Sequence, residues 1–133
     1  MNSKTTNNEK VFHSENNNSK VIFADSNTSF NRLTEIIEQT TDVKIIVFDI
    51  KLRKKLLKNN INHIISDDFL NENDLELIQN KAYSLSKWFE QPEICSELTF
   101  EHVNIGRLFH EQFVEFLVEF LKKYKVIYNF YKK

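Results

Sequence analysis

The sequence of 133 residues has few of the small and rigid residues that interrupt most folds. It contains one glycine, one proline and one cysteine, which are Gly106, Pro92 and Cys95. Phosphate-binding loops bring two or three glycines close together so that the backbone can approach a phosphate group. A single glycine therefore excludes the dinucleotide-binding fingerprint and the P-loop. A single cysteine excludes an intramolecular disulfide and a cysteine-based metal cluster.

A strong net charge and long apolar runs are also missing. The net charge is −1, so no overall field attracts nucleic acid or an acidic membrane surface. No segment reaches the roughly 18–20 apolar residues of a membrane-spanning helix, and the first residues are polar, unlike a signal peptide. We therefore expect a cytoplasmic protein that binds no nucleic acid and has no membrane span.

The chain divides into a polar tail and one folded domain. Residues 1–19 are rich in asparagine and predict a disordered tail, with a short strand at Lys10–His13 as the alternative. Residues 20–133 contain apolar runs and helical patterns in a length that is typical of a single domain. Hydrophobic residues make up 41% of the chain, which is enough for a core.

The first half of this domain alternates between strand and helix patterns. Apolar runs of strand length occur at Val21–Ala24 and Lys44–Phe48, and Ile61–Ile65 forms a third, weaker strand pattern. Between them, residues 30–37 and 52–57 place apolar side chains three and four positions apart, as a helix does. Such alternation is typical of a parallel sheet with covered faces. We predict an α/β fold, namely a partial Rossmann-like, three-stranded parallel sheet in the order 3-2-1 with flanking helices.

Two more helices are predicted in the second half. The first begins at Asn71 or Asn73 and ends before Pro92, because proline disfavours helical geometry in the residue before it. The second runs from near Glu101 to the late 120s as a long C-terminal helix with a wide apolar stripe. We expect this stripe to pack as core, so that Phe116→Ala is among the most damaging single changes.

Polar residues that follow the first two strands form the candidate ligand-binding site. Asp25, Ser26 and Asn27 follow the first strand, and Asp49 follows the second. Ligands of open α/β sheets bind beyond the carboxyl ends of the strands, where a helix N-terminus favours anionic groups. Simple helix capping is the alternative, because any helix start prefers these residue types.

The other chemistry-bearing residues favour structural roles. The basic segment at residues 51–58 lacks interleaved aromatic residues, so it is interpreted as a solvated face. The four histidines lack the spacing of a zinc-binding helix. Cys95 has no histidine near it in the sequence and is interpreted as an inert small hydrophobe. We predict no catalytic residue, no metal site and no cofactor.

Four short segments occur in an order that resembles a known family. They are VIFADSNTSF at 21–30, ISDDFL at 65–70, SKWF at 86–89 and VNIGRL at 103–108. Over about residues 20–128 the chain resembles the N-terminal Rossmann-like part of archaeal and bacterial surface-carbohydrate biosynthesis proteins, which are similar to glycosyltransferases and CDP-glycerol glycerophosphotransferases. The resemblance implies a truncated or split N-terminal domain without activity alone, because the nucleotide-sugar site is expected mainly in a second domain. It carries over only Asp25, Ser26 and Asn27, as an acceptor-side edge.

The alternative function is a free-standing small α/β protein-interaction module. The strand at Val21–Ala24 would lie at an edge of the sheet, with no proline or lysine inside it to prevent pairing. The long helix carries more apolar residues than a three-stranded sheet can cover, and large apolar patches usually mark interfaces. We therefore expect a protein partner or a homo-oligomer that uses the first-strand edge and the long C-terminal helix.

Overall fold

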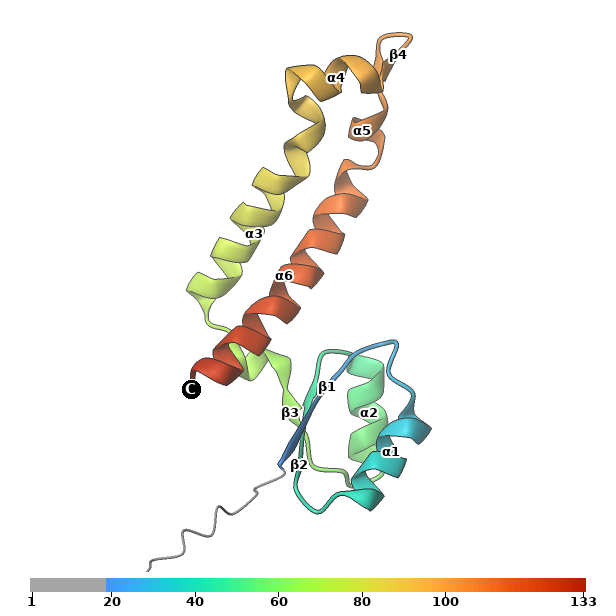
Figure 1. Cartoon of the computed structure of the whole chain (residues 1–133), viewed down its shortest axis with the longest axis vertical. Helices are drawn as coiled ribbons and strands as arrows, with labels where there is room; N and C mark the ends of the chain where they lie inside the picture. The colour runs from blue at the N-terminus through green and yellow to red at the C-terminus, as the bar shows by residue number, and fades with distance from the viewer. Residues whose placement is uncertain (1–18) are drawn as a thin grey trace, which may run out of the picture.

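A computed structural model describes residues 19–133 (Figure 1). The predicted tail at 1–19, apart from its last residue, and the alternative strand at Lys10–His13 lie outside the described residues. The first half contains β1 (Lys20–Ala24), α1 (Phe30–Gln39), β2 (Val43–Val47), α2 (Ile50–Lys58), β3 (Ile64–Ile65) and the 3-10 turn η1 (Ser66–Phe69). The second half contains α3 (Glu72–Ser86), the 3-10 turn η2 (Lys87–Glu90), α4 (Pro92–Leu98), β4 (Thr99–Phe100), β5 (Val103–Asn104), α5 (Ile105–Leu108) and α6 (His110–Lys132).

The main sheet confirms the predicted fold class and strand order. Its three strands are parallel and lie in the order β1-β2-β3, with Ile22 opposite Ile45 and Ala24 opposite Val47. The third strand, Ile64–Ile65, is shorter than the predicted Ile61–Ile65 because Ile61 takes part in the C-terminal cap of α2. Asn60 adopts a φ of 55°, and the N–H of Ile61 donates to the carbonyl of Leu56.

Both connecting helices cover the same face of the sheet (Figure 1). Right-handed crossovers that step twice in the same direction place both helices on one side. Alternate strand residues point to this side, where Ala24, Ile45 and Val47 form a buried cluster with Leu33 of α1 and Leu56 of α2. This cluster is the core of the α/β part.

The C-terminal part of α6 lies against the opposite face of the sheet. The ring of Phe23, which points away from α1 and α2, packs edge-on against Phe130 with centroids 5.7 Å apart. Val126 of α6 and Ile46 of β2 are both fully buried, although neither belongs to the cluster under α1 and α2. The sheet is therefore covered on both faces, on the second face by α6.

The rest of α6 forms an antiparallel helical hairpin with α3, which projects away from the sheet (Figure 1). Helix α6 does not begin near Glu101 as predicted but at His110. The reason is a small antiparallel β-hairpin of β4 and β5, in which Glu101 and His102 have φ values of 46° and 67°. Positive φ at both central residues is the geometry of a type I′ turn, which glycine and asparagine usually provide. Because Glu101 and His102 occupy these positions instead, the sequence gave no sign of the turn.

The prediction that the apolar stripe of α6 packs as core is wrong for its centre. Phe116 is 61% exposed, and Phe109, Phe120 and Tyr124 are also more than half exposed. The residues of α6 that face α3 lie on a different side of the helix, so the chain does not cover this row of aromatic side chains. Phe116→Ala is therefore not expected to remove a buried side chain from the chain's own core.

Gly106 is required by close packing rather than by an unusual backbone angle. A Cβ atom at this position would lie 2.4 Å from the Cβ of Phe89, far inside van der Waals contact. Phe89 is itself only 3% exposed, and its Cβ is fixed to the backbone, so it cannot move aside. The single glycine of the chain thus lets α5 approach η2 at the tip of the hairpin.

Gly106→Ala should therefore destabilise the protein, even though alanine is the better helix former by about 1 kcal/mol. Overpacking of a closed contact costs typically about 1–3 kcal/mol, and we expect a net loss in this range. Chemical denaturation measures the effect. The exposed neighbour Arg107 provides the control, and Arg107→Ala should leave the stability nearly unchanged. Equal stability of the Gly106→Ala and Arg107→Ala variants would contradict the close approach.

Candidate functional site

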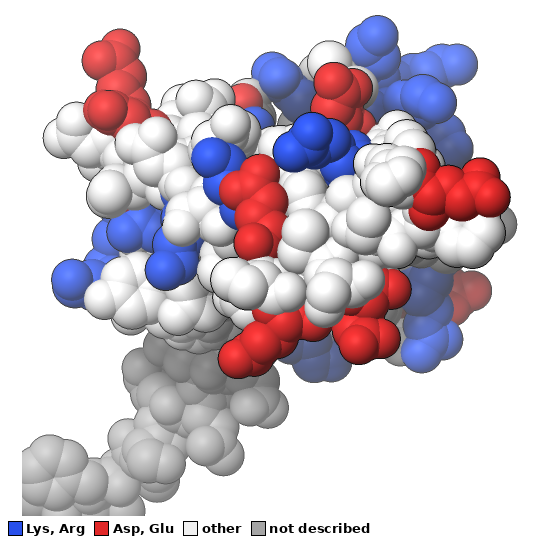
Figure 2. Space-filling view, turned by 90° about the horizontal axis from the view of Figure 1, so that it is seen from above, with Lys and Arg blue, Asp and Glu red and all other residues white. Residues whose placement is uncertain are grey.

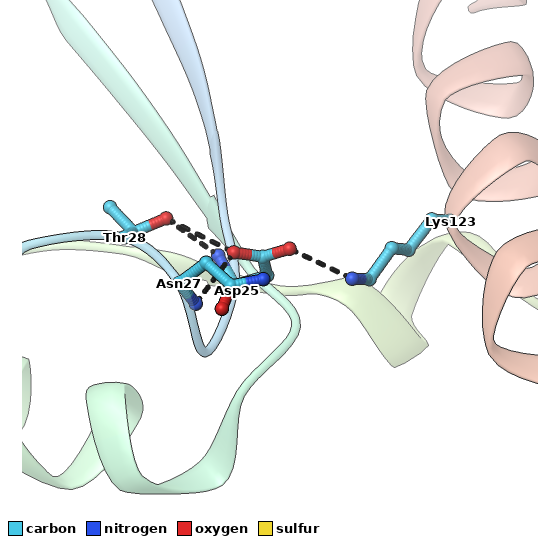
Figure 3. Close-up of polar contacts among 4 residues, drawn as sticks. All are labelled: Asp25, Asn27, Thr28 and Lys123. Carbon is cyan, nitrogen blue, oxygen red and sulfur yellow. Dashed lines mark hydrogen bonds and ion pairs between the residues drawn. The ribbon is translucent and has the colours of Figure 1, made fainter. Parts of the chain in front are cut away.

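The predicted site residues Asp25 and Asn27 lie in a tight turn at the end of β1 (Figure 3). The carboxylate oxygen Oδ1 of Asp25 accepts a hydrogen bond from the backbone N–H of Asn27 at 2.9 Å. The backbone N–H of Asp25 donates to the hydroxyl oxygen Oγ1 of Thr28, also at 2.9 Å. This side-chain-to-backbone pattern fixes the path of the chain from β1 into α1.

The second carboxylate oxygen of Asp25 binds a lysine that is distant in sequence. Nζ of Lys123 on α6 lies 2.8 Å from Oδ2 of Asp25 (Figure 3). The hydrogen bond from Lys123, together with that from the N–H of Asn27, holds the pKa of Asp25 below its ordinary value. The ion pair connects the end of β1 to the middle of α6, and no local sequence pattern could have revealed it.

Asp49 follows the neighbouring strand end and caps the next helix. Its oxygen Oδ2 accepts a hydrogen bond from the backbone N–H of Leu52 at 2.7 Å, which satisfies one free donor at the start of α2. Ser29, rather than Ser26 or Asn27, is the N-cap of α1, and Ser26 is exposed. Asp25 and Asp49 thus follow the ends of two paired strands. Asp25 stabilises a turn and forms an ion pair, and Asp49 caps a helix. Ligand binding by Asp25, Ser26, Asn27 and Asp49 stays a prediction.

A second polar cluster joins the start of α3 to the end of α6. Asn71 and Asp74 form a reciprocal capping box at the start of α3. Asp74 also binds Nζ of Lys125 at 3.1 Å and accepts from Nδ2 of Asn129 at 3.2 Å. Asn129 donates in addition to the backbone carbonyl of Phe69 at 2.7 Å. The sequence predicted the cap at Asn71 but gave no sign of its contacts with α6.

Two opposing effects act on the acidity of Asp74, which is almost fully buried. Desolvation raises the pKa of its carboxyl group. The hydrogen bond from Lys125 and the capping contact with Asn71 outweigh this and leave the pKa below its ordinary value. The cluster therefore holds a charged carboxylate between two helices at neutral pH.

A serine and a histidine meet near the tip of the hairpin, but their geometry is structural. The hydroxyl of Ser86 donates to the carbonyl of Tyr83 at 2.7 Å, and its oxygen lies 2.8 Å from Nε2 of His110. Because a hydroxyl has one proton, Nε2 of His110 must donate to Ser86. A serine nucleophile needs the reverse direction, in which histidine accepts the proton. Ser86 is also fully buried, so the pair locks α3 to α6.

A row of aromatic residues, mostly exposed, runs along α6 from its N-cap, and we name it the aromatic face. It consists of Phe109, Phe113, Phe116, Phe120 and Tyr124. Spacings of three and four residues place these side chains along one side of the helix. The rings of Phe113, Phe116 and Phe120 stack in sequence, each 6.3 Å from the next. The row is therefore ordered as well as exposed.

The aromatic face continues onto α3 through two apolar hollows. Leu77, Ile78 and Ser84 of α3 line a groove of about 470 Å³ together with Leu121 and Tyr124 of α6. Nearer the tip, Trp88 and Phe113 lie on a smaller hollow of about 190 Å³, with ring centroids 6.4 Å apart. Both helices of the hairpin thus contribute to one largely apolar surface.

The tip of the α3–α6 hairpin also exposes apolar side chains. Figure 2, seen from above, shows acidic and basic groups spread over this end of the molecule with uncharged surface between them. Phe100 of the β-hairpin and Leu108 and Phe109 beside it are more than half exposed. The exposed apolar surface therefore extends to the tip of the molecule.

The chain has no match among known proteins that would assign its function. No protein-family model, no curated protein and no solved structure matches this chain. Within residues 19–133 no helix combines the length and apolar character that crossing a membrane requires. In the same described part, no cluster of three or more His, Cys, Asp and Glu side chains is arranged to hold a metal ion.

The Asp74 cluster predicts a specific acid sensitivity. A carboxyl group with a lowered pKa in the folded state contributes stability above its unfolded pKa of about 4, and loses it as the pH falls through the folded value. Asp74→Asn should therefore be less stable than the wild type at pH 7, and the difference should shrink below about pH 4. Thermal unfolding across this pH range measures it. Asp67→Asn, at an exposed aspartate, is the control and should show no such convergence. A constant difference between Asp74→Asn and the wild type at every pH would contradict the role of the charge.

Proposed function

We propose that the chain is a protein-interaction module whose docking surface is the aromatic face. One observation carries this proposal: a stacked row of aromatic side chains runs along α6 and is exposed to solvent. Aromatic residues dominate the energetics of protein interfaces and are enriched at their centres. Rings that already stack lose little conformational freedom when a partner covers them.

The exposed area of the aromatic face is as large as that of typical interaction sites. A buried Phe or Tyr hides roughly 150–250 Å². Phe109, Phe116, Phe120 and Tyr124 are each about 60% exposed, so together they leave on the order of 400–600 Å² in water. This reaches the upper end of the largest apolar patch on a typical monomer, and patches of that size usually mark interaction sites.

The carboxylates at the strand ends support an enzyme less well. Oxygen atoms of Asp25 and Asp49 already serve a turn, an ion pair and a helix cap. Lys123 keeps Asp25 ionised, so Asp25 has no proton to give as a general acid, and its lowered pKa makes it a weaker general base. The proposal therefore assigns these residues to the scaffold that positions α6.

The second candidate is that the chain is a truncated or split N-terminal domain of a glycosyltransferase-like protein. It is favoured by the parallel order β1-β2-β3, which the N-terminal part of a Rossmann-like domain would share. In that case the aromatic face or the outer edge of β1 would contact the remainder of the protein. Purified chain should then transfer no glycosyl or glyceryl group from an activated donor, and measurable transfer would contradict this candidate.

Site-specific photocrosslinking tests the docking surface directly. We expect p-benzoylphenylalanine at position 116 to give one discrete crosslinked protein product in cells of the source organism. The same probe at position 57 is the matched control, because Leu57 on α2 is similarly exposed, at 56%, but lies outside the aromatic face. No product from position 116, or equal products from both positions, would contradict the proposed function.

A further inference from the structure

We infer that the occupant of the aromatic face is a second copy of this chain, and that two α3–α6 hairpins pair in antiparallel orientation as a four-helix bundle. This inference rests on the proposed function, because it names the partner that the docking surface takes. Four features support it: the incomplete packing of the hairpin, the charge pattern along α6, the spacing of the aromatic face and the area available.

The hairpin has an interface between its helices but lacks a covered core. Helix α3 buries one narrow line of residues against α6, spaced four apart: Asp74, Ile78, Ala82 and Ser86. On the side of the aromatic face, Leu77, Leu85 and Trp88 of α3 remain substantially exposed. A helix pair that is apolar on one side needs a second layer, and a second helix pair supplies it in four-helix bundles.

The charges of α6 are separated along its length. The first half carries Glu111, Glu115 and Glu119, and the second half carries Lys122, Lys123, Lys125 and Lys132 with no acidic residue. Lys123 and Lys125 pair with Asp25 and Asp74 of the same chain, so the attraction between copies rests on Lys122 and Lys132. In a parallel pair, the two acidic halves of α6 would lie beside each other, and so would the two basic halves. An antiparallel pair places each acidic half near the basic half of the other copy, which favours association and sets its direction.

The aromatic face is compatible with such two-fold symmetry. From Phe109 to Phe120 its spacings of four, three and four residues are those of helix seams that pack against another helix. The next seam position is Lys123, which binds Asp25 within the chain, and Tyr124 lies beside it. A two-fold axis perpendicular to the hairpin pairs the same patch with itself, which is the usual geometry of homodimers.

The area is sufficient for a stable dimer. The four most exposed aromatic residues contribute on the order of 400–600 Å² per copy, and Leu77, Leu85 and Trp88 add to it. Two copies would then bury roughly 1,000–1,600 Å² in total, which reaches the range of about 1,200–2,000 Å² for specific interfaces. The α/β parts would lie at opposite ends of the bundle, since each hairpin projects away from its own sheet.

Sedimentation equilibrium is the first test. At tens of micromolar the wild type should have twice the chain mass of 15.9 kDa. Phe116→Lys/Phe120→Lys should be a folded monomer, with helix content checked by circular dichroism. Ile50→Lys/Leu57→Lys changes equally exposed apolar residues of α2 and should remain a dimer. A monomeric wild type, or dissociation of the α2 control to the same extent, would overturn the inference.

A distance measurement tests the orientation without altering the aromatic face. Glu101→Cys in a Cys95→Ser background places one spin label at the tip of each hairpin. The aromatic face runs 15 positions from Phe109 to Tyr124, or about 22 Å, and an antiparallel pair turns it about its centre. The tips, which lie beyond Phe109, are then more than about 20 Å apart, whereas those of a parallel pair lie side by side. Separations below about 20 Å would overturn the antiparallel arrangement.

The mass of the photocrosslinked product separates this inference from the proposed function. A product from position 116 with twice the chain mass supports both. A product of another mass, together with a monomeric wild type, overturns the second copy as occupant but leaves the docking surface intact. A covalent link from position 116 to a segment of the same chain outside α6 would show that this segment covers the face, and would overturn both.

Discussion

The packing of the C-terminal part of α6 against the sheet is the contact on which the rest of the structure depends. The two crossover helices lie on one face, so the second face needs a cover that the βα units cannot supply. The C-terminal part of α6 provides it through Val126 and Phe130, while Lys123 binds Asp25 at the end of β1. Once that part is fixed, the remaining turns of α6 must project beyond the sheet, where α3 is the element that packs beside them.

This arrangement explains why the aromatic face is exposed. Residues on an α-helix repeat every 3.6 positions, so one helix offers separate sides to separate neighbours. In α6 one side contacts the sheet near its C-terminus and a second side contacts α3, where Lys125 and Asn129 meet Asp74. Phe116 and Phe120 lie on a side that faces neither neighbour. Polar contacts fix the two ends of the hairpin, at Asp74 and at the Ser86–His110 pair, and hold this side in one orientation.

Local patterns in the sequence predicted the sheet and its order but not the direction in which α6 faces. Apolar runs and cap residues identified β1, β2, α1, α2 and α3, because those signals lie within a few residues of each other. The start of α6 was misplaced because Glu101 and His102 form a turn that glycine or asparagine would normally mark. Phe116 was misjudged because periodicity shows that a side is apolar and does not show what covers it. Asp25 and Asp49 were correctly placed at the strand ends, but the partner Lys123 lies 98 positions away from Asp25 and leaves no local trace.

The hairpin's apolar side is exposed to water in a single chain, and we propose that association covers it. Trp88, the only tryptophan, reports on it without any substitution, because it lies beside Phe113 and is 42% exposed in the single chain. Trp88 fluorescence should be measured in a dilution series from tens of micromolar to nanomolar concentration. The account predicts a red shift on dilution, as the indole moves from a covered interface into water, with unchanged helix content by circular dichroism. An emission maximum that stays constant across the whole series would contradict it.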